Sequence, residues 1–319
     1  MNNEHPQTWL AYDDPLAVLA VQAIRTGNVP GLTQLLAGNP GLAKARIVGA
    51  EEGRASNEGT GSGETGDAGI TETVGEDISN TGASNEGNGN ANSGDVGTRA
   101  NSENTGGGTD RGMSRTLLHI ATDWPGHYPN NAAVVTALIE AGADANAQFG
   151  GPHSETPLHW AASCDDIEVL DLLLDAGADI EASGAVIAGG TPLDDAVAFA
   201  QWRAAQRLVE RGASPALWHA AALGLLDRME AHFAGDLLSR RFPWGASSGS
   251  AAPDEVNVAF WCACHGGQRA AAEYLLGQGA ELSWPSPWDC LSPLDAALRS
   301  NATELAAWLE GLGAQSAHQ

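Results

Sequence analysis

The sequence predicts an all-α solenoid, in which helix-turn-helix units stack side by side and short fingers project between them. Two observations support this fold class. A segment that opens on Thr-Pro-Leu or a close variant and ends on Gly-Ala recurs along the chain, and each copy holds two apolar helical patterns separated by a turn. One such unit cannot bury both faces of its helices, so several units must stack to form a common core.

The clearest copies align without gaps. "TPLHWAASCDDIEVLDLLLDAGAD" begins at Thr156, "TPLDDAVAFAQWRAAQRLVERGAS" at Thr191 and "SPLDAALRSNATELAAWLEGLGAQ" at Ser292. Each copy reaches its Gly-Ala after the same interval. This regularity indicates that a structural unit is repeated, and it argues against a single reactive cluster around His159.

Other copies depart from this pattern. A copy at Thr116 fits if the connection around "WPGHYPN" is lengthened, and two degenerate copies begin at Ala216 and Ala259, where no Thr-Pro stands. Residues 16–46 resemble a first, capping copy. The predicted organisation is a capping unit in residues 1–48 and about six units in residues 113–319.

Helix boundaries follow from the residues at the ends of each unit. Thr156 is a favourable N-cap, and Pro157 suits the first helical position, where a missing N–H costs nothing. Gly177 follows the second helix as a C′ residue, where a left-handed backbone carries no Cβ penalty. Gly142 and Gly212 take the same place in other copies.

The repeating unit resembles the ankyrin repeat, a unit of about 33 residues in which Thr-Pro-Leu-His opens the first of two antiparallel helices. The two degenerate copies are similar in arrangement to those of bacterial ankyrin-repeat proteins of unassigned function. The resemblance implies that His119 and His159 bond the threonine and the backbone around them. It places other residues at this tie position in the remaining copies, namely Asp194, Trp218, Trp261 and Asp295.

Residues 49–112 form a separate compositional segment. From Ala50 to Gly112 the sequence contains twelve acidic residues, three arginines and no aromatic residue, and it is rich in Gly, Asn, Ser and Thr. Its sparse apolar side chains cannot offset the entropy of ordering. We expect an acidic disordered insertion, and a second flexible loop near residues 234–256.

Composition limits the possible partners. Forty acidic residues against fifteen basic ones give a formal net charge of −25, which repels phosphate backbones and anionic lipid headgroups. No stretch approaches the roughly 20 uninterrupted apolar residues of a membrane span, and the N-terminal sequence lacks a signal-peptide pattern. We expect a cytoplasmic monomer that binds neither nucleic acid nor membranes.

The cysteines and glycines do not predict a cofactor site. Cys164, Cys262, Cys264 and Cys290 are irregularly spaced, which favours neither a disulfide framework nor a zinc site. The glycine-rich "GTGSGETG" has no strand before it and no helix after it, as a phosphate loop would require. We expect no metal and no cofactor.

A catalytic alternative rests on the residue that follows the tie position, which points to the concave side in the ankyrin family. In successive copies this row holds Ile120, Trp160, Asp195, His219, Cys262 and Ala296. The consecutive Asp195, His219 and Cys262 suggest a nucleophile and a base. Equivalent positions in stacked units are about 8–10 Å apart, whereas a nucleophile and its base need about 2.6–3.2 Å. The row therefore favours a lined surface over a triad, and a ligand-binding or catalytic pocket stays the alternative.

Exposed aromatic side chains are the main candidates for function. Aromatic rings on a rigid frame bury a large area at little entropic cost. They occur here in the row, in two fingers ("QFGGPHSE" and "SWPSPWDCL") and in the lengthened connection. The predicted partner-binding residues are Trp124, His127, Tyr128, Phe149, His153, Trp160, Trp284 and Trp288. The sequence thus predicts a non-catalytic protein that binds another protein, with a stabilising factor lacking a selective partner as a further alternative.

Overall fold

The computed structural model describes residues 8–49, 113–239 and 254–317. The described parts on either side of the predicted insertion belong to one compact unit. Apart from Gly49, the predicted insertion lies outside the described residues. The same holds for residues 240–253 of the second predicted loop.

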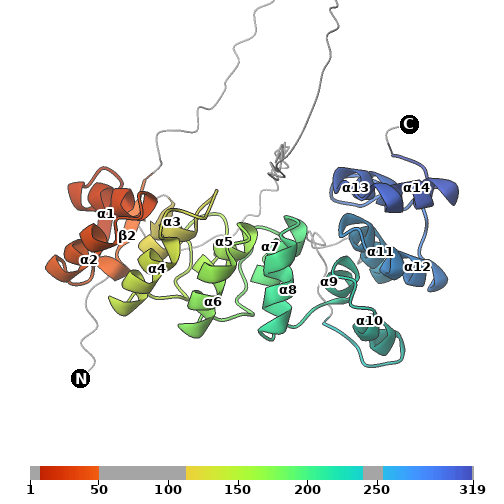
Figure 1. The fold of residues 1–319 in the computed structure, drawn as a ribbon, viewed down its shortest axis with the longest axis horizontal. Coiled ribbons are helices and arrows are strands. Elements are labelled where there is room, and N and C mark those ends of the chain that lie inside the picture. The colour runs from red at the N-terminus through yellow and green to blue at the C-terminus, as the bar shows by residue number, and fades with distance from the viewer. Residues whose placement is uncertain (1–7, 50–112, 240–253, 318–319) are drawn as a thin grey trace, which may run out of the picture. The chain divides into compact units, whose positions relative to one another are not determined.

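Helices dominate the described residues, and their contacts confirm the predicted all-α solenoid. The first helices of neighbouring units contact one another in the order α1, α3, α5, α7, α9, α11 and α13, and the second helices α2, α4, α6 and α8 do likewise. Figure 1 shows these pairs lying side by side from α1–α2 to α7–α8. The helices are α1 (Pro15–Arg25), α2 (Val29–Gly38), α3 (Leu117–Thr122), α4 (Asn131–Glu140), α5 (Pro157–Ser163), α6 (Ile167–Asp175), α7 (Pro192–Ala198), α8 (Trp202–Glu210), α9 (Leu217–Ala222), α10 (Leu226–Phe233), α11 (Glu255–His265), α12 (Arg269–Gly277), α13 (Pro293–Arg299) and α14 (Thr303–Gly311), with a short 3-10 helix, η1 (Leu42–Lys44).

The helix ends occur where the capping residues predict them. Thr156 is the N-cap of α5 with Pro157 in its first turn, and Thr191 and Ser292 cap α7 and α13 in the same way. Gly177, after α6, has a φ of +88°, in the left-handed region that glycine adopts without strain. Each unit is named below by its N-cap residue.

The first helices carry most of the core. Leu158, Ala161 and Ala162 of α5 are fully buried, and the small alanines allow the close approach of neighbouring helices. From α6, Leu170 and Leu173 are also fully buried, and each such leucine contributes about 1.5–3 kcal/mol. The two faces of an interior pair are therefore both covered by its neighbours.

A small sheet, which the sequence did not predict, closes the N-terminal part. β1 (Trp9–Ala11) pairs in parallel with β2 (Arg46–Val48), which pairs antiparallel with β3 (Ser114–Thr116). Val48 lies opposite Ser114, so the described residues on the two sides of the insertion are neighbours in one ladder. Strands of three residues are too short to show an alternating pattern, which explains why they were missed.

Candidate functional site

The tie histidines join each unit to the next. The Thr116 amide donates to His119 Nδ1 at 3.3 Å, and His119 Nε2 lies 3.1 Å from the carbonyl oxygen of Glu155. His159 repeats this geometry with the Thr156 amide at 3.1 Å and the Gly190 carbonyl at 3.3 Å. Since Nδ1 accepts, Nε2 must carry the proton and donate to the carbonyl.

The protonation of these rings agrees with a structural role. Burial lowers the pKa of His119 to about 4, although its bond to the Glu155 carbonyl opposes the shift. Burial also lowers the pKa of His159. Both rings are neutral near pH 7 with both nitrogens engaged, so the predicted role as ties is confirmed.

The Thr191 and Ala216 units use a different pair of side chains. The Thr191 amide and hydroxyl donate to Asp194 Oδ2, and His219 Nε2 lies 3.2 Å from Asp194 Oδ1. Burial would raise the pKa of Asp194, but its bonds to His219 and Thr191 outweigh burial and hold it at about 2. An ionised carboxylate thus accepts the inter-unit bond from the next ring.

The register predicted for the Ala216 unit was wrong by one residue. The Ala216 amide donates to His219 Nδ1 at 2.9 Å, so His219 occupies the tie position that was assigned to Trp218. α9 is one residue shorter than α5, which shifts any alignment based on the second helix. In the next unit, Trp261 holds the tie position as predicted, because its indole N–H donates to the Leu291 carbonyl at 3.0 Å.

The row predicted to line a surface is mostly buried. Asp195 and Cys262 have no exposed surface, and Ile120 and Ala296 are also buried. Burial raises the pKa of the Cys262 thiol well above its ordinary range, which disfavours a thiolate. Both His219 nitrogens face other partners, Ala216 and Asp194. This geometry gives no support to an Asp195–His219–Cys262 pocket.

Trp160 is the member of the row that is partly exposed, and it forms an aromatic cluster with the finger before α5. The Phe149 and His153 rings stack with centroids 4.7 Å apart, and the Phe149 and Trp160 centroids are 5.6 Å apart. The His119 and Trp160 rings meet in a T-shaped arrangement with their centroids 5.0 Å apart. Phe149, His153 and Trp160 are all among the candidates predicted from the sequence, and the structure brings these three together. We call them the aromatic surface.

Glu155 anchors the aromatic surface from the buried side. Its Oε2 accepts from the Trp160 indole at 2.8 Å and lies 2.9 Å from His153 Nδ1, while its Oε1 accepts from the Val186 amide at 3.1 Å. Burial would raise the pKa of Glu155, but the bonds from His153 and Asp195 lower it to about 2. The Glu155 carboxylate thus holds the His153 and Trp160 rings in place and also binds the backbone of the next finger at Val186.

Asp195 lies behind Glu155 and has the opposite protonation. Burial and repulsion by the Glu155 carboxylate raise the pKa of Asp195 well above its ordinary value. The two pKa shifts are opposite, which favours a protonated Asp195 beside an ionised Glu155, so the pair carries one negative charge. Sequence reasoning missed Glu155, because an acidic residue in a finger ordinarily reads as a solvated side chain.

Comparison with known proteins follows the same units. A family model described as "Ankyrin repeats (3 copies)" matches residues 97–184 and 118–218. Residues 97–218 match the ankyrin repeat family. A putative ankyrin repeat protein of fowlpox virus, FPV233, is 44% identical over 68 residues, which are 21% of this chain and 12% of that protein. The human ASB11 ankyrin repeat domain matches with a TM-score of 0.37 and 22% identity, over 63% of this chain and 85% of that one.

Ankyrin repeats are in general protein-protein interaction modules.

The other predicted candidates lie elsewhere on the helical units. Trp284 and Trp288 are half-buried against the core, where Trp288 meets Trp261 edge-on at 5.0 Å. In the α3–α4 connection, Trp124 is 70% exposed, and His127 Nε2 donates to the Cys164 carbonyl at 2.9 Å. Tyr128 in the same connection is half-buried.

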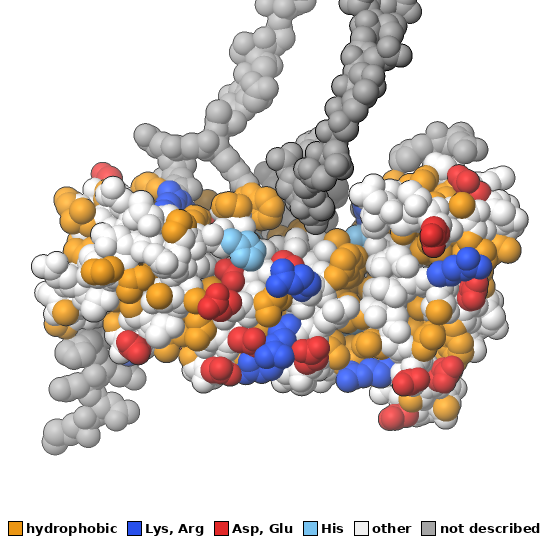
Figure 2. All heavy atoms as spheres, viewed as in Figure 1, with side chains coloured by type: hydrophobic (Ala, Val, Ile, Leu, Met, Phe, Trp, Pro, Cys, Tyr) orange, Lys and Arg blue, Asp and Glu red, His pale blue; other side chains and the backbone are white. Residues whose placement is uncertain are grey.

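The faces of α6 and α8 carry charges of both signs. Arg207 and Arg211 both bind Asp171, at 2.9 Å and 2.5 Å, and Arg211 also reaches Asp175 at 2.6 Å. Figure 2 shows the acidic and basic side chains interleaved over these helices. Such pairing leaves no patch of one sign there.

Among the described residues, no group of three or more His, Cys, Asp or Glu side chains is arranged to hold a metal ion. Within the same residues, none of the helices is both long and apolar enough to cross a bilayer.

Proposed function

We propose that this protein binds another protein through the aromatic surface of Phe149, His153 and Trp160. One observation carries the proposal: three partly exposed rings from a finger and a first helix contact one another and rest on the buried Glu155 carboxylate. The repeat frame does not require an aromatic residue at any of these three positions. Aromatic rings held in place before binding lose little entropy on association.

The remaining candidates extend this proposal. Trp124, His127 and Tyr128 form a second contact region in the α3–α4 connection, and Trp284 and Trp288 form a third in the finger before α13. Trp124 supports its region by its exposure, whereas the half-burial of Trp284 and Trp288 makes them weaker anchors. The proposed role is non-catalytic and cytoplasmic, with residues 1–48 as a capping unit and residues 49–112 as an acidic insertion that follows it in the sequence.

Crosslinking in the native cell tests the proposal. A photoreactive amino acid at Phe149 is expected to trap a defined partner, and Trp160→Ala is expected to reduce recovery of that partner by about tenfold or more, as loss of an interface anchor does. Phe199→Ala is the matched control, because Phe199 is an exposed aromatic residue on another turn.

If the partner is recovered equally well with the wild type and with Trp160→Ala, the assignment of the surface is overturned. Circular dichroism of each variant controls for folding, because Trp160 also donates to Glu155. Phe149→Ala removes a ring without removing a hydrogen-bond donor, so its loss of binding supports recognition by the ring itself.

A further inference from the structure

The N-terminal helix pair, α1 and α2, differs chemically from the rest of the chain. No aspartate or glutamate occurs from Pro15 to Gly49, although the whole sequence contains 40 acidic residues. α1 presents Val18 and Leu19 to solvent, with exposed fractions of 45% and 50%. Terminal units of repeat proteins ordinarily need a polar outer face for solubility, so this end is unusually apolar and lacks acidic residues.

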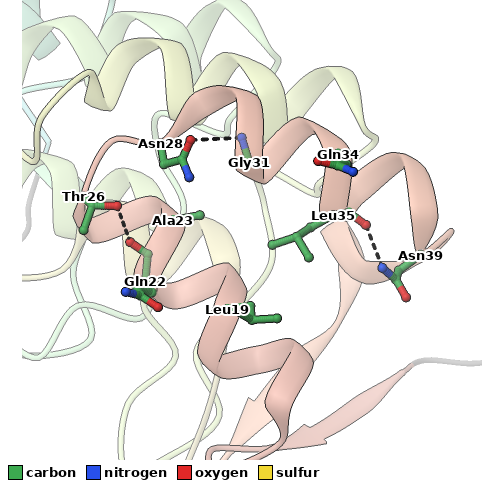
Figure 3. A pocket seen from close by; sticks show the side chains of 9 residues that line it. All are labelled: Leu19, Gln22, Ala23, Thr26, Asn28, Gly31, Gln34, Leu35 and Asn39. Atoms are coloured by element: carbon green, nitrogen blue, oxygen red, sulfur yellow. Dashed lines mark hydrogen bonds between the residues drawn. The ribbon is translucent and has the colours of Figure 1, made fainter.

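A groove of about 580 Å³ lies between α1 and α2. Figure 3 shows Leu19 of α1 and Leu35 of α2 projecting into it, with the amides of Gln22, Asn28 and Gln34 around them. No charged residue lines the groove. Asn28 accepts from the Gly31 amide, whereas the side-chain amides of Gln22 and Gln34 make no hydrogen bond to other described residues.

The groove continues the interface that holds the solenoid together. α1 packs on α3, and α2 packs on α4. In interior units a helix is contacted from both sides, as α5 is by α3 and α7. The opposite side of α1–α2 is therefore the open end of a stacking series, and a helix pair is what this interface accepts elsewhere in the chain.

We propose that the α1–α2 groove binds the α1–α2 pair of a second copy of this chain, giving a two-fold symmetric dimer. The two faces bring no carboxylates together. A head-to-tail arrangement would instead desolvate exposed acids of α14, such as Glu304 and Glu310, against an uncharged groove, which is costly. A glutamine amide both donates and accepts, so Gln22 and Gln34 can each pair with a symmetry-related copy.

A dimer differs from the monomer expected from the sequence, and its formation does not depend on the aromatic surface. Sedimentation velocity of the full chain is expected to show a reversible monomer-dimer equilibrium with a Kd on the order of micromolar, as befits an interface of two short helices per copy. Leu19→Glu is expected to weaken it about a hundredfold, because two carboxylates would then meet in the groove. Phe199→Glu is the matched control, with an exposed apolar residue changed far along the chain, and is expected to leave the dimer unchanged.

The outcomes separate cleanly. A chain that stays monomeric up to about 200 µM, well above the expected Kd, would overturn the proposal. So would a dimer that survives Leu19→Glu, or one that is lost equally in Phe199→Glu. Leu19 is half-exposed and glutamate is a good helix former, so Leu19→Glu is expected to fold, which circular dichroism checks.

Discussion

Neighbouring units are connected by different chemistry in two regions of the chain. One region comprises the Thr116 and Thr156 units, and the other comprises the Thr191 and Ala216 units. In the first two, a neutral histidine accepts from its own N-cap amide and donates to a carbonyl of the next unit. In the Thr191 unit an ionised Asp194 replaces that histidine, and His219 of the following unit donates to it. The comparison shows that the position requires a polar connection between units, while the charge and the direction of the bond can change.

The largest expected loss of stability follows from removing the charged connection between Asp194 and His219. His219→Ala removes the donor to the buried Asp194 carboxylate and also leaves the Ala216 amide without its acceptor. We expect a loss of about 3–5 kcal/mol in the free energy of unfolding, as for other buried charges that lose a partner. Urea denaturation measures the loss, and a cost below that of His159→Ala would contradict the comparison.

Removing the neutral connection at His159 is expected to cost less stability than removing His219. His159→Ala leaves the Thr156 amide and the Gly190 carbonyl unpaired in a buried site, but it strands no charge. We expect a loss of about 2 kcal/mol in the same urea experiment. His159→Gln offers a matched variant, because its amide can restore part of the bonding, and it should fall between the wild type and His159→Ala.

The smallest expected effect concerns the buried carboxyl pair. Asp195 has a raised pKa in the folded chain, so its contribution to stability is present at low pH and is lost as the pH rises through that pKa. Glu155, with a pKa of about 2, contributes above its ordinary value of 4.5 and loses that contribution as the pH falls toward 2. Asp195→Asn keeps the shape of the side chain and cannot ionise.

We therefore expect Asp195→Asn to match the wild type at pH 5 and to exceed it by about 1 kcal/mol at alkaline pH, where the wild-type pair would carry a second buried charge. Thermal unfolding at a series of pH values measures the difference. A variant that is less stable than the wild type at every pH would show that Asp195 is ionised in the fold.

Many helix ends of the repeating units could be predicted from residues close to each end. Thr156, Pro157 and Gly177 mark helix ends through capping and backbone preferences that act within a few residues, and the structure places the ends there. The Ala216 unit was misread because no Thr-Pro marks its start and α9 is a residue shorter than α5. The β1–β2–β3 sheet was missed because its strands are short and far apart in sequence.

The site was only partly predictable for a different reason. Phe149, His153 and Trp160 stood out by type, since the frame does not require aromatic residues at those positions. Their common anchor did not, because the burial of Glu155 depends on the next finger, whose Val186 amide donates to it. The burial of Asp195 likewise follows from packing between units, which spacing within one unit does not reveal.

The histidines of the Thr-x-Leu-His motifs act as neutral ties between units and not as reactive groups. Nitrogen-15 NMR of the histidine rings tests it most directly, because it reports tautomer and protonation for each ring. We expect His119 to hold its proton on Nε2 and to stay neutral from pH 7 down to about pH 5, with a pKa of about 4. A proton on Nδ1, or titration of His119 near its ordinary value of 6.5, would contradict it.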